Sequence, residues 1–411
     1  MQSDRPDILI VGGGILGSAL AWQLALKQAG SILVIDPDLA GTFSSSERNA
    51  GGARATWWHP LNAELAWRSM QFFESIAEEI QFFQRGYLFL YSTPRWKIAQ
   101  QKRELYRRLG IPVEYLSPQE ARPRLPEFEN WKGIAGATFS PKDGLLDPHL
   151  LKEWYRSKAK EAGVRFQDRS YLSGVICQGR RAREVQVQLR ERPPGESELE
   201  SLLTEHRLDA EWREERLYPK ILINCTGAWL KLSSGYYSQP LPIEPVRRQI
   251  ALFSSQAEDL SGRGMVVDSS GLYFHPEGSH SGLVLAGYSN RDEKPGYSFR
   301  YDGEKFFDRK IWLRLYRRGG RRHFDAIHHV RGWAGLYAVG PDKSAVLGAA
   351  EGLENVYELG AATGRGVMQS YALSLALAEL IAEGRFGSFD AAALSPSRFH
   401  GGEPVREDLD I

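Results

Sequence analysis

The sequence predicts an α/β protein whose chain forms two interleaved domains, one built on a parallel sheet and one on a mixed, largely antiparallel sheet. Three features indicate this fold class: a strand, glycine turn, helix and strand in succession over residues 7–36, further buried strands that end near Cys225 and Gly360, and aromatic-rich alternating segments between them. A chain of 411 residues is also longer than one compact core usually accommodates. We assign the first domain to residues 1–85, 146–235 and 326–411, and the second to residues 86–145 and 236–325.

Residues 7–36 are predicted to form a βαβ unit with a nucleotide-binding turn. The strand DILIV leads into GGGILG, the helix SALAWQLALKQAG and the strand SILVID. Gly12, Gly14 and Gly17 fit the pattern G-x-G-x-x-G, in which glycines permit a tight turn, close approach of a pyrophosphate and packing of helix on strand. Asp36 ends the next strand and supplies a carboxylate for an adenosine ribose, where it would repel a 2′-phosphate. The unit therefore disfavours NADP and leaves NAD and FAD open.

A second glycine turn, TGRG, precedes a long apolar helix near the end of the chain. FAD is a long molecule, so its isoalloxazine has to be held far from the pyrophosphate. A helix N-terminus presents free N–H groups and a positive dipole end, which would stabilise negative charge on a reduced flavin. Gly364 and Gly366 would let the backbone approach the ring, and Arg365 is either an added positive charge or an exposed turn residue. We predict that this turn receives the flavin rather than the phosphates.

The composition excludes several classes of function. The net charge of +1 gives no general attraction to nucleic acid or to acidic membranes. The two cysteines, Cys177 and Cys225, are too few for a disulfide framework or a cysteine-rich metal site. Gly12 to Gly17 interrupt the first apolar run too early for a membrane span or a secretory leader. We expect a cytoplasmic protein that binds neither metal nor nucleic acid.

Two polar stretches are expected to be solvated. Residues 190–216 are interpreted as an excursion between strands, and residues 314–331 as an exposed basic helix and turn rather than a nucleic-acid patch. Trp57, Trp58 and His59 could wall a pocket, and His59 is more simply a structural histidine. The adjacent pair His328 and His329 points to opposite sides of a strand and forms no chelate.

Several segments occur in an order that resembles a known family. They are GGGILG with Asp36, SSERNAGGAR, GLLDPHLLKEWYRSKAKEAGV, INCTGAW, PIEPVRRQI, RGWAGLYAVGPD and the TGRG helix. In this order they resemble the D-amino-acid/glycine/sarcosine oxidase (DAO) superfamily of FAD enzymes over nearly the whole chain. DSSGLYFHPEG, GWAGLY and the C-terminal tail are similar to the subgroup containing a mitochondrial FAD-dependent oxidoreductase domain protein implicated in respiratory complex I assembly. The resemblance implies a Rossmann-like, glutathione-reductase-type FAD-binding domain interleaved with an antiparallel substrate domain.

The resemblance also implies which residues surround the FAD. The pyrophosphate contacts fall on Gly12, Gly14, Ile15, Leu16 and Gly17, the ribose contacts on Asp36 and Pro37, and the adenine contact on Leu172. The rest of the cofactor envelope comprises Arg48, Asn49, Gly51, Gly52, Arg54, Gly227, Trp229, Gly335, Leu336, Gly364, Arg365, Gly366, Val367 and Met368.

This sequence departs from the family at the substrate and flavin positions. Tyr337 stands where glycine oxidases carry an arginine that pairs with the substrate carboxylate. Gly335 replaces the cysteine that attaches flavin covalently in sarcosine oxidases, so FAD should be non-covalent, and Met368 replaces their carboxylate-binding lysine. Arg54 is then the best candidate to bind a carboxylate, and Lys294 falls near the lysine that promotes oxygen reaction.

The family chemistry implies a function of two possible kinds. The first is oxidation of the C–N bond of an amino acid or small secondary amine by hydride transfer to flavin N5, giving an imine, with oxygen or another acceptor reoxidising the flavin. Arg54, Tyr337 and Lys294 are the candidate catalytic residues. The alternative is a flavin-stabilised assembly factor for a respiratory complex with little or no turnover, in which residues 190–216 and 314–322 would dock the partner.

Overall fold

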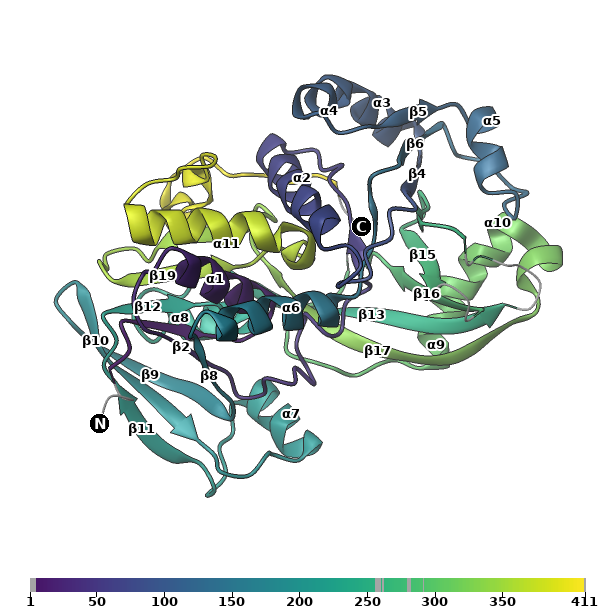
Figure 1. Ribbon diagram of the computed structural model, residues 1–411. Helices are drawn as coiled ribbons and strands as arrows, with labels where there is room; N and C mark the ends of the chain where they lie inside the picture. Colours follow the sequence, from purple (N-terminus) through teal and green to yellow (C-terminus); the bar gives the residue numbers. More distant parts are fainter. Residues whose placement is uncertain (1–4, 256–259, 261, 279–281, 291, 410–411) are drawn as a thin grey trace.

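The computed structural model describes residues 5–255, 260, 262–278, 282–290 and 292–409. Two large sheets organise these residues, and they lie at opposite ends of the molecule (Figure 1). None of the described helices combines the length and apolar character that a membrane span requires.

The first sheet is the predicted parallel one. Strand β1 pairs in parallel with β12 on one side and β2 on the other, and β18 adds an antiparallel edge. The strands in spatial order are β18 (Val346–Ala349), β19 (Val356–Gly360), β12 (Ile221–Asn224), β1 (Ile8–Val11), β2 (Ile32–Ile35) and β8 (Arg165–Gln167).

Both faces of this sheet are covered, which explains why its strands read as continuous apolar runs. Ile8 and Ile10 on β1 pack against helices α1 (Ile15–Leu26) and α11 (Gly366–Glu383). Leu9 and Val11 point the other way, toward a three-stranded sheet. That smaller sheet contains β9 (Ser170–Gln178), β10 (Arg181–Leu189) and β11 (Arg213–Leu217).

The second large sheet is the expected mixed one, in which only β14 and β4 pair in parallel among the described strands. Its strands in spatial order are β17 (Ile327–Val339), β13 (Glu244–Ser255), β16 (Leu283–Tyr288), β15 (Leu272–Glu277), β14 (Met265–Val267), β4 (Tyr87–Tyr91), β6 (Gly136–Ser140) and β5 (Glu114–Leu116). Strands β3 (Gly52–Ala53) and β7 (Gly144–Leu145) form a separate two-stranded ladder.

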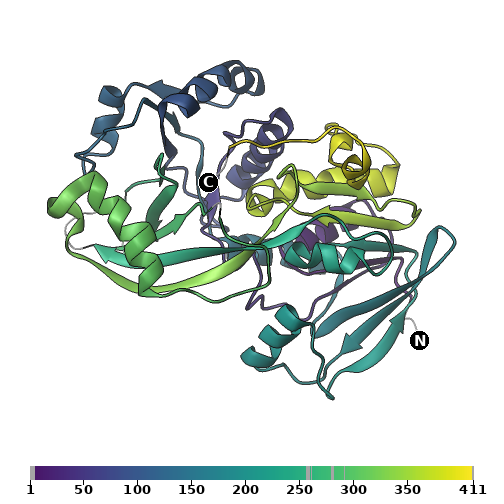
Figure 2. The same cartoon turned by 180° about the vertical axis from the view of Figure 1, so that it is seen from behind.

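The predicted domain boundary at residue 326 needs a correction. It assigns β17 to the nucleotide-binding domain, but β17 hydrogen-bonds to β13 along most of its length and belongs to the antiparallel sheet. The two long strands run side by side in both views (Figure 2). Apolar and polar residues alternate only weakly along β17, so only its cross-strand pairing shows which sheet it joins.

The remaining helices surround the two sheets. Helices α6, α1, α11 and α2 contact one another in that order over the parallel sheet (Figure 1). The helices not yet given are α2 (Pro60–Ser75), α3 (Thr93–Gln101), α4 (Arg103–Leu109), α5 (Pro118–Ala121), α6 (Pro148–Glu161), α7 (Glu196–Glu205), α8 (Leu230–Ser234), α9 (Glu304–Phe306) and α10 (Leu313–Phe324).

The stretch 190–216 is not the solvated excursion that its composition suggested. It contains α7 and most of β11, and the α7 side chains Leu199, Leu202 and Leu203 are buried. They pack in a cluster with Phe43, Tyr171 and Trp229. The charged residues of α7 lie on its outer face. Composition alone suggested a solvated segment because an amphipathic helix can be mostly polar and still bury one apolar face. The basic run 314–331 is helical only as far as Phe324, in α10, with a break at Gly320, and its last residues, from Ile327, belong to strand β17.

Candidate functional site

A cavity of about 650 Å³ lies between the carboxyl ends of the parallel strands and the antiparallel sheet. Val11, Cys225 and Gly360 line it from the first sheet, and Arg248 and Val267 from the second. The predicted residues that line it are Gly12, Gly14, Ile15, Leu16, Asp36, Pro37, Asn49, Gly52, Arg54, Leu172, Gly227, Trp229, Leu336, Tyr337, Gly364, Arg365, Gly366, Val367 and Met368.

The first glycine turn has the close packing that its pattern predicted. Gly12 has a φ of +105°, and a Cβ there would lie 2.4 Å from the carbonyl oxygen of Cys225. A Cβ on Gly17 would lie 1.9 Å from the carbonyl oxygen of Gly12, so Gly17 packs helix on strand and does not line the cavity. Helix α1 begins at Ile15, whose N–H donates to the hydroxyl of Ser46 at 3.0 Å. The following N–H groups of the first turn point toward the cavity end of the helix, which suits an anion.

Asp36 stands at the edge of the same turn, as expected for a ribose contact. Its carboxylate accepts hydrogen bonds from the backbone N–H of Gly13 at 2.7 Å and of Asp38 at 2.8 Å. Burial raises the pKa of Asp36 to about 6, and these two N–H groups oppose the rise. Asp36 therefore fixes the turn and faces the cavity with the same side chain.

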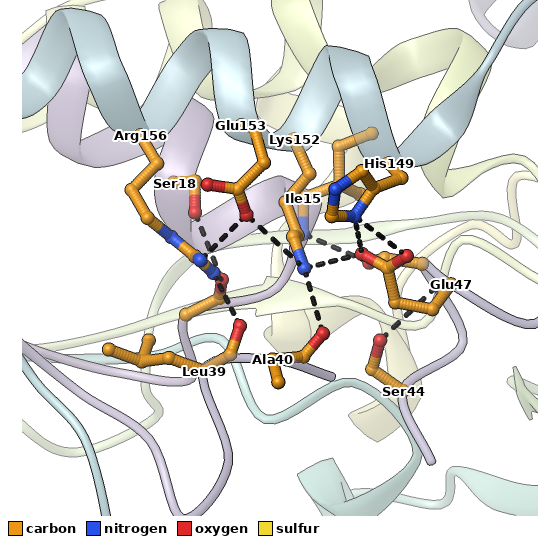
Figure 3. A network of polar contacts seen from close by, with 12 residues as sticks. Ile15, Ser18, Leu39, Ala40, Ser44, Glu47, His149, Lys152, Glu153 and Arg156 are labelled. Carbon is orange, nitrogen blue, oxygen red and sulfur yellow. Dashed lines mark hydrogen bonds and ion pairs between the residues drawn. The ribbon is translucent and has the colours of Figure 1, made fainter. Parts of the chain in front are cut away.

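A polar network behind the turn was not predicted (Figure 3). The guanidinium of Arg156 on α6 donates to the carbonyl oxygens of Gly13 at 3.1 Å and Leu39 at 3.0 Å. Lys152, one helical turn earlier and 1% exposed, pairs with Glu47 and donates to the carbonyl oxygen of Ala40 at 3.3 Å. The network joins α6 to the glycine turn at Gly13 and to the loop that follows β2. The sequence contained one signal for this network: Lys152 and Arg156 are four residues apart, so they lie on the same face of the helix that begins at Pro148.

Three further predicted contact residues, like Gly17, do not line the cavity. Arg48 donates to the carbonyl oxygens of Thr42 at 2.7 Å and Ala334 at 2.9 Å, so its side chain ties the loop to β17. A Cβ on Gly335 would lie 3.1 Å from the Cβ of Arg48, and one on Gly51 would lie 2.4 Å from the carbonyl oxygen of Leu146. These residues shape the loop that carries Asn49, Gly52 and Arg54 to the cavity.

The second glycine turn also reaches the cavity. Gly364 has a φ of +78°, and a Cβ there would lie 2.5 Å from Cε2 of Tyr337. Arg365 precedes α11 without capping it, so the first N–H groups of this helix are available at the wall. Arg365 is 2% exposed and lines the cavity, which excludes the reading of an exposed turn residue. Burial lowers the pKa of Arg365 to about 10.

The end of the cavity beside this turn is a compartment of aromatic rings and guanidinium groups. Arg54 is 1% exposed, and its Cζ lies 3.4 Å from the ring centroid of Trp57. Its Nη2 has no hydrogen-bond partner among the described residues. Burial raises the pKa of Tyr87 and of Tyr273 well above the usual range, so both phenols in this wall stay neutral.

Lys294 does not take part in this compartment. It is exposed and does not line the cavity, whereas its neighbour Glu293 does. The prediction failed because the loop could not be placed by sequence spacing. Leu203 on α7, Leu409 in the C-terminal tail and Arg248 on β13 line the cavity and were not predicted.

The described residues include no group of three or more histidine, cysteine, aspartate or glutamate side chains able to hold a metal ion. His59 has the predicted structural role, since its Nδ1 accepts from the N–H of Leu61 at 3.2 Å and caps α2. Cys177 and Cys225 are both free thiols.

The donor set fits a long dinucleotide with a flavin at one end. The crowded glycine turn and the N-terminus of α1 suit a pyrophosphate, and Asp36 suits a ribose. The uncapped N-terminus of α11, with the orphaned Nε and Nη2 of Arg365 beside it, suits an electron-rich ring system. Gly335 offers no side chain for a covalent link.

Comparison with known proteins agrees with this geometry. The profile of the DAO family, described as FAD dependent oxidoreductase, matches residues 7–380. FAD-dependent oxidoreductase domain-containing protein 1 of Bos taurus is 28% identical over 437 residues, covering 99% of this chain and 87% of the relative. Mitochondrial dimethylglycine dehydrogenase of Mus musculus is 24% identical, and the match covers 96% of this chain but 44% of the relative.

Solved structures show the same fold. L-proline dehydrogenase from P. horikoshii has a TM-score of 0.79 at 25% identity, covering 97% of this chain and 99% of that one. Glycine oxidase from Geobacillus kaustophilus has a TM-score of 0.76 at 19% identity, covering 96% and 99%. Because the family profile spans most of the sequence, the chain belongs to the DAO family of FAD-dependent oxidoreductases.

Proposed function

We propose that this protein oxidises the C–N bond of an amino acid or a small secondary amine to an imine. The observation that carries the proposal is the compartment beside the start of α11, where Arg54, Trp57 and Tyr337 line the cavity. The names of its relatives support the same chemistry, since they include dimethylglycine dehydrogenase, L-proline dehydrogenase and glycine oxidase. When bound, FAD supplies the hydride acceptor, and oxygen or another acceptor then takes the electrons.

Arg54 is suited to hold the substrate carboxylate. Its guanidinium is stacked on Trp57 and buried, and Nη1 makes only a long contact of 3.5 Å with the carbonyl oxygen of Thr56. The unpartnered Nη2 leaves a charged donor that an incoming carboxylate would satisfy. A carboxylate fixed there would hold the rest of the substrate within the compartment, which is the positioning that this reaction needs.

The other walls of the compartment supply shape and neutral donors. Tyr337 packs against Gly364, so its ring lies where α11 begins. Tyr87 and Tyr273 keep their protons because burial raises their pKa values. These phenols can donate hydrogen bonds without adding charge, and Trp57 excludes water from one side.

The experiment that tests the proposal is an anaerobic titration of the yellow protein with amino acids, N-methyl amino acids and amines. Bleaching of the oxidised flavin absorbance by one compound would establish an amine-oxidising enzyme. The rate of reoxidation after air is admitted would then separate an oxidase from a dehydrogenase. If no donor bleaches the flavin while dithionite does, the proposal is wrong.

The role of Arg54 is tested by Arg54→Ala. We expect a loss of about tenfold or more in kcat/KM for a carboxylate-bearing substrate, because a charged hydrogen bond is removed. Arg95→Ala is the matched control, since the Cζ of Arg95 lies 4.7 Å from the ring centroid of Trp58 and the side chain does not line the cavity. Unchanged kinetics in Arg54→Ala would remove Arg54 from the site.

The alternative role in assembly of a respiratory complex remains a prediction. One of the two segments expected to dock a partner is committed to the cavity, because Leu203 of α7 lines it. The charged outer face of α7 and the basic helix α10 are the candidate surfaces that remain. Charge reversal on α10 should abolish capture of a partner while flavin reduction is unchanged, if that role is correct.

A further inference from the structure

Arg248 stands at the junction of two cavities. It lies on β13 opposite Gly335 of β17, and its side chain extends diagonally so that Cζ lies 5.2 Å from the ring centroid of Tyr337. It lines the main cavity and also a smaller one of about 270 Å³. Glu293 is the other residue that lines both.

The guanidinium of Arg248 is only partly satisfied by the protein. Its Nη1 donates to the carbonyl oxygen of Arg247 at 2.9 Å. Its Nε is buried and has no hydrogen-bond partner among the described residues. A buried charged donor without an acceptor is costly, and an anionic ligand group would remove that cost.

The smaller cavity carries an excess of positive charge. The two carboxylates that line it, Glu293 and Asp302, both accept hydrogen bonds from Arg247. Its further cationic lining residues are Arg248, Lys305, Arg309 and Lys310. A cleft with an excess of one sign of charge concentrates ligands of the opposite sign, so this cavity favours anions.

Arg54 and Arg248 reach the compartment from different elements. Arg54 follows β3 and is stacked on Trp57, whereas Arg248 belongs to β13 and faces Tyr337. Each guanidinium keeps its own unpartnered nitrogen, Nη2 in Arg54 and Nε in Arg248. Beside Arg365 at the start of α11, Arg54 and Arg248 therefore offer two anion-binding positions on separate elements.

We propose that Arg248 binds a second carboxylate of the substrate, so that the preferred substrates are amines carrying two carboxylates. This inference rests on the proposed function and specifies its substrate class. One carboxylate meets Arg54, and the other reaches Arg248 at the entrance to the basic cavity. Arg248 thereby takes the role of a specificity-determining residue.

The test measures binding and does not depend on turnover. The FAD-loaded protein is titrated with acetate and with succinate at equal pH and ionic strength, and each dissociation constant is read from the perturbation of flavin absorbance. Succinate should bind about tenfold or more tightly than acetate, since it gains one further charged contact. Arg248→Gln should remove most of this preference by weakening succinate.

Two further variants make the result specific. Arg248→Lys keeps the charge but loses the planar fork, so it should retain part of the succinate preference. It also serves as the deciding variant if Arg248→Gln does not fold. Arg331→Gln is the matched control, because Arg331 lies on neighbouring β17 and contacts the Trp333 ring at 5.7 Å without lining either cavity. It should leave the preference intact.

Equal binding of acetate and succinate to the unsubstituted protein would overturn the inference, as would a succinate preference that survives in Arg248→Gln. The inference would also be overturned if Arg248→Gln weakened the binding of acetate and of succinate to the same extent. A single carboxylate would then contact both Arg54 and Arg248. The proposed function fails separately, by an absence of flavin bleaching with every amine. A succinate preference without bleaching would leave the pocket assignment standing.

Discussion

The Nη2 atom of Arg156 lies 3.1 Å from the carbonyl oxygen of Gly13, although the two residues are 143 positions apart in the chain. This contact joins helix α6 to the turn that is expected to hold the pyrophosphate. The same guanidinium donates to Leu39, and Glu153 on the same helix accepts from its Nη1 at 2.7 Å. Arg156 thus supports the turn from behind and does not line the cavity.

Arg156→Met should weaken FAD binding, by about tenfold, because Gly13 and Leu39 lose a buried charged donor. The measurement is the dissociation constant of FAD, from quenching of flavin fluorescence on addition to the apoprotein. Lys158→Met is the control, since Lys158 lies on the same helix and forms a surface pair with Glu161 at 2.8 Å. Equal FAD affinity in the two variants would show that the network does not support the turn.

Gly364→Ala should reduce both stability and FAD binding. The residue has a φ of +78°, and its Cβ would lie 2.5 Å from the Tyr337 ring. Gly384→Ala is a matched control for the backbone strain alone, because Gly384 has a φ of +70° and nothing within 4 Å of a Cβ. We expect about 1 kcal/mol lost in Gly384→Ala and clearly more in Gly364→Ala, measured by thermal unfolding. Equal losses would mean that Tyr337 moves aside freely.

Helix α7 should be required for cofactor retention. Trp229 donates from Nε1 to the carbonyl oxygen of Leu203 at 2.6 Å, and both residues line the cavity. Leu203→Asp places a charge in this wall and should lower FAD affinity by about tenfold or more. Glu200→Lys, on the exposed face of α7, should not. Unchanged affinity in Leu203→Asp would show that α7 does not support the cofactor site.

Glu358→Gln should stabilise the protein above neutral pH. Glu358 is 1% exposed, and burial raises its pKa to about 8 although Tyr237 and Asn224 donate toward it. The folded state therefore holds this proton more tightly than the unfolded chain, whose pKa is 4.5, so stability falls as pH rises from about 4.5 to about 8. The variant lacks this loss and should gain about 2–4 kcal/mol at pH 8.5, with little change at pH 5.

Thermal unfolding at the two pH values checks this prediction. Glu354→Gln is the control, because Glu354 is exposed and pairs with Arg181 at 3.4 Å on the surface. A gain of the same size at both pH values in Glu358→Gln would indicate improved packing rather than removal of a buried charge.

The nucleotide-binding half could be predicted because its information is local. Gly12, Gly14 and Asp36 lie within one βαβ unit, and the spacing of glycines and carboxylate is fixed by the turn itself. The second turn at Gly364 was predicted for the same reason, since a glycine turn before an apolar helix is a local pattern. Sequence also indicated correctly that Arg54 belongs to the wall of the site.

The substrate end could not be predicted in the same way because its residues come from elements that are distant in sequence. Strand β17 joins the antiparallel sheet through its pairing with β13, and that register alone brings Arg248 to Tyr337. Lys294 does not line the cavity because of the path of its loop, and the spacing of residues in the sequence does not constrain that path.

By itself, the sequence determined the α/β class and the two glycine turns, since each depends on short-range patterns of φ, helix termini and strand ends. The order of its motifs along the chain indicated the family and, with it, FAD. The tertiary structure decided which side chains share a cavity, because cross-strand register and helix packing are long-range properties. It buried α7 against the site, placed Arg156 beneath Gly13, and brought Arg54 and Arg248 to separate walls of one compartment.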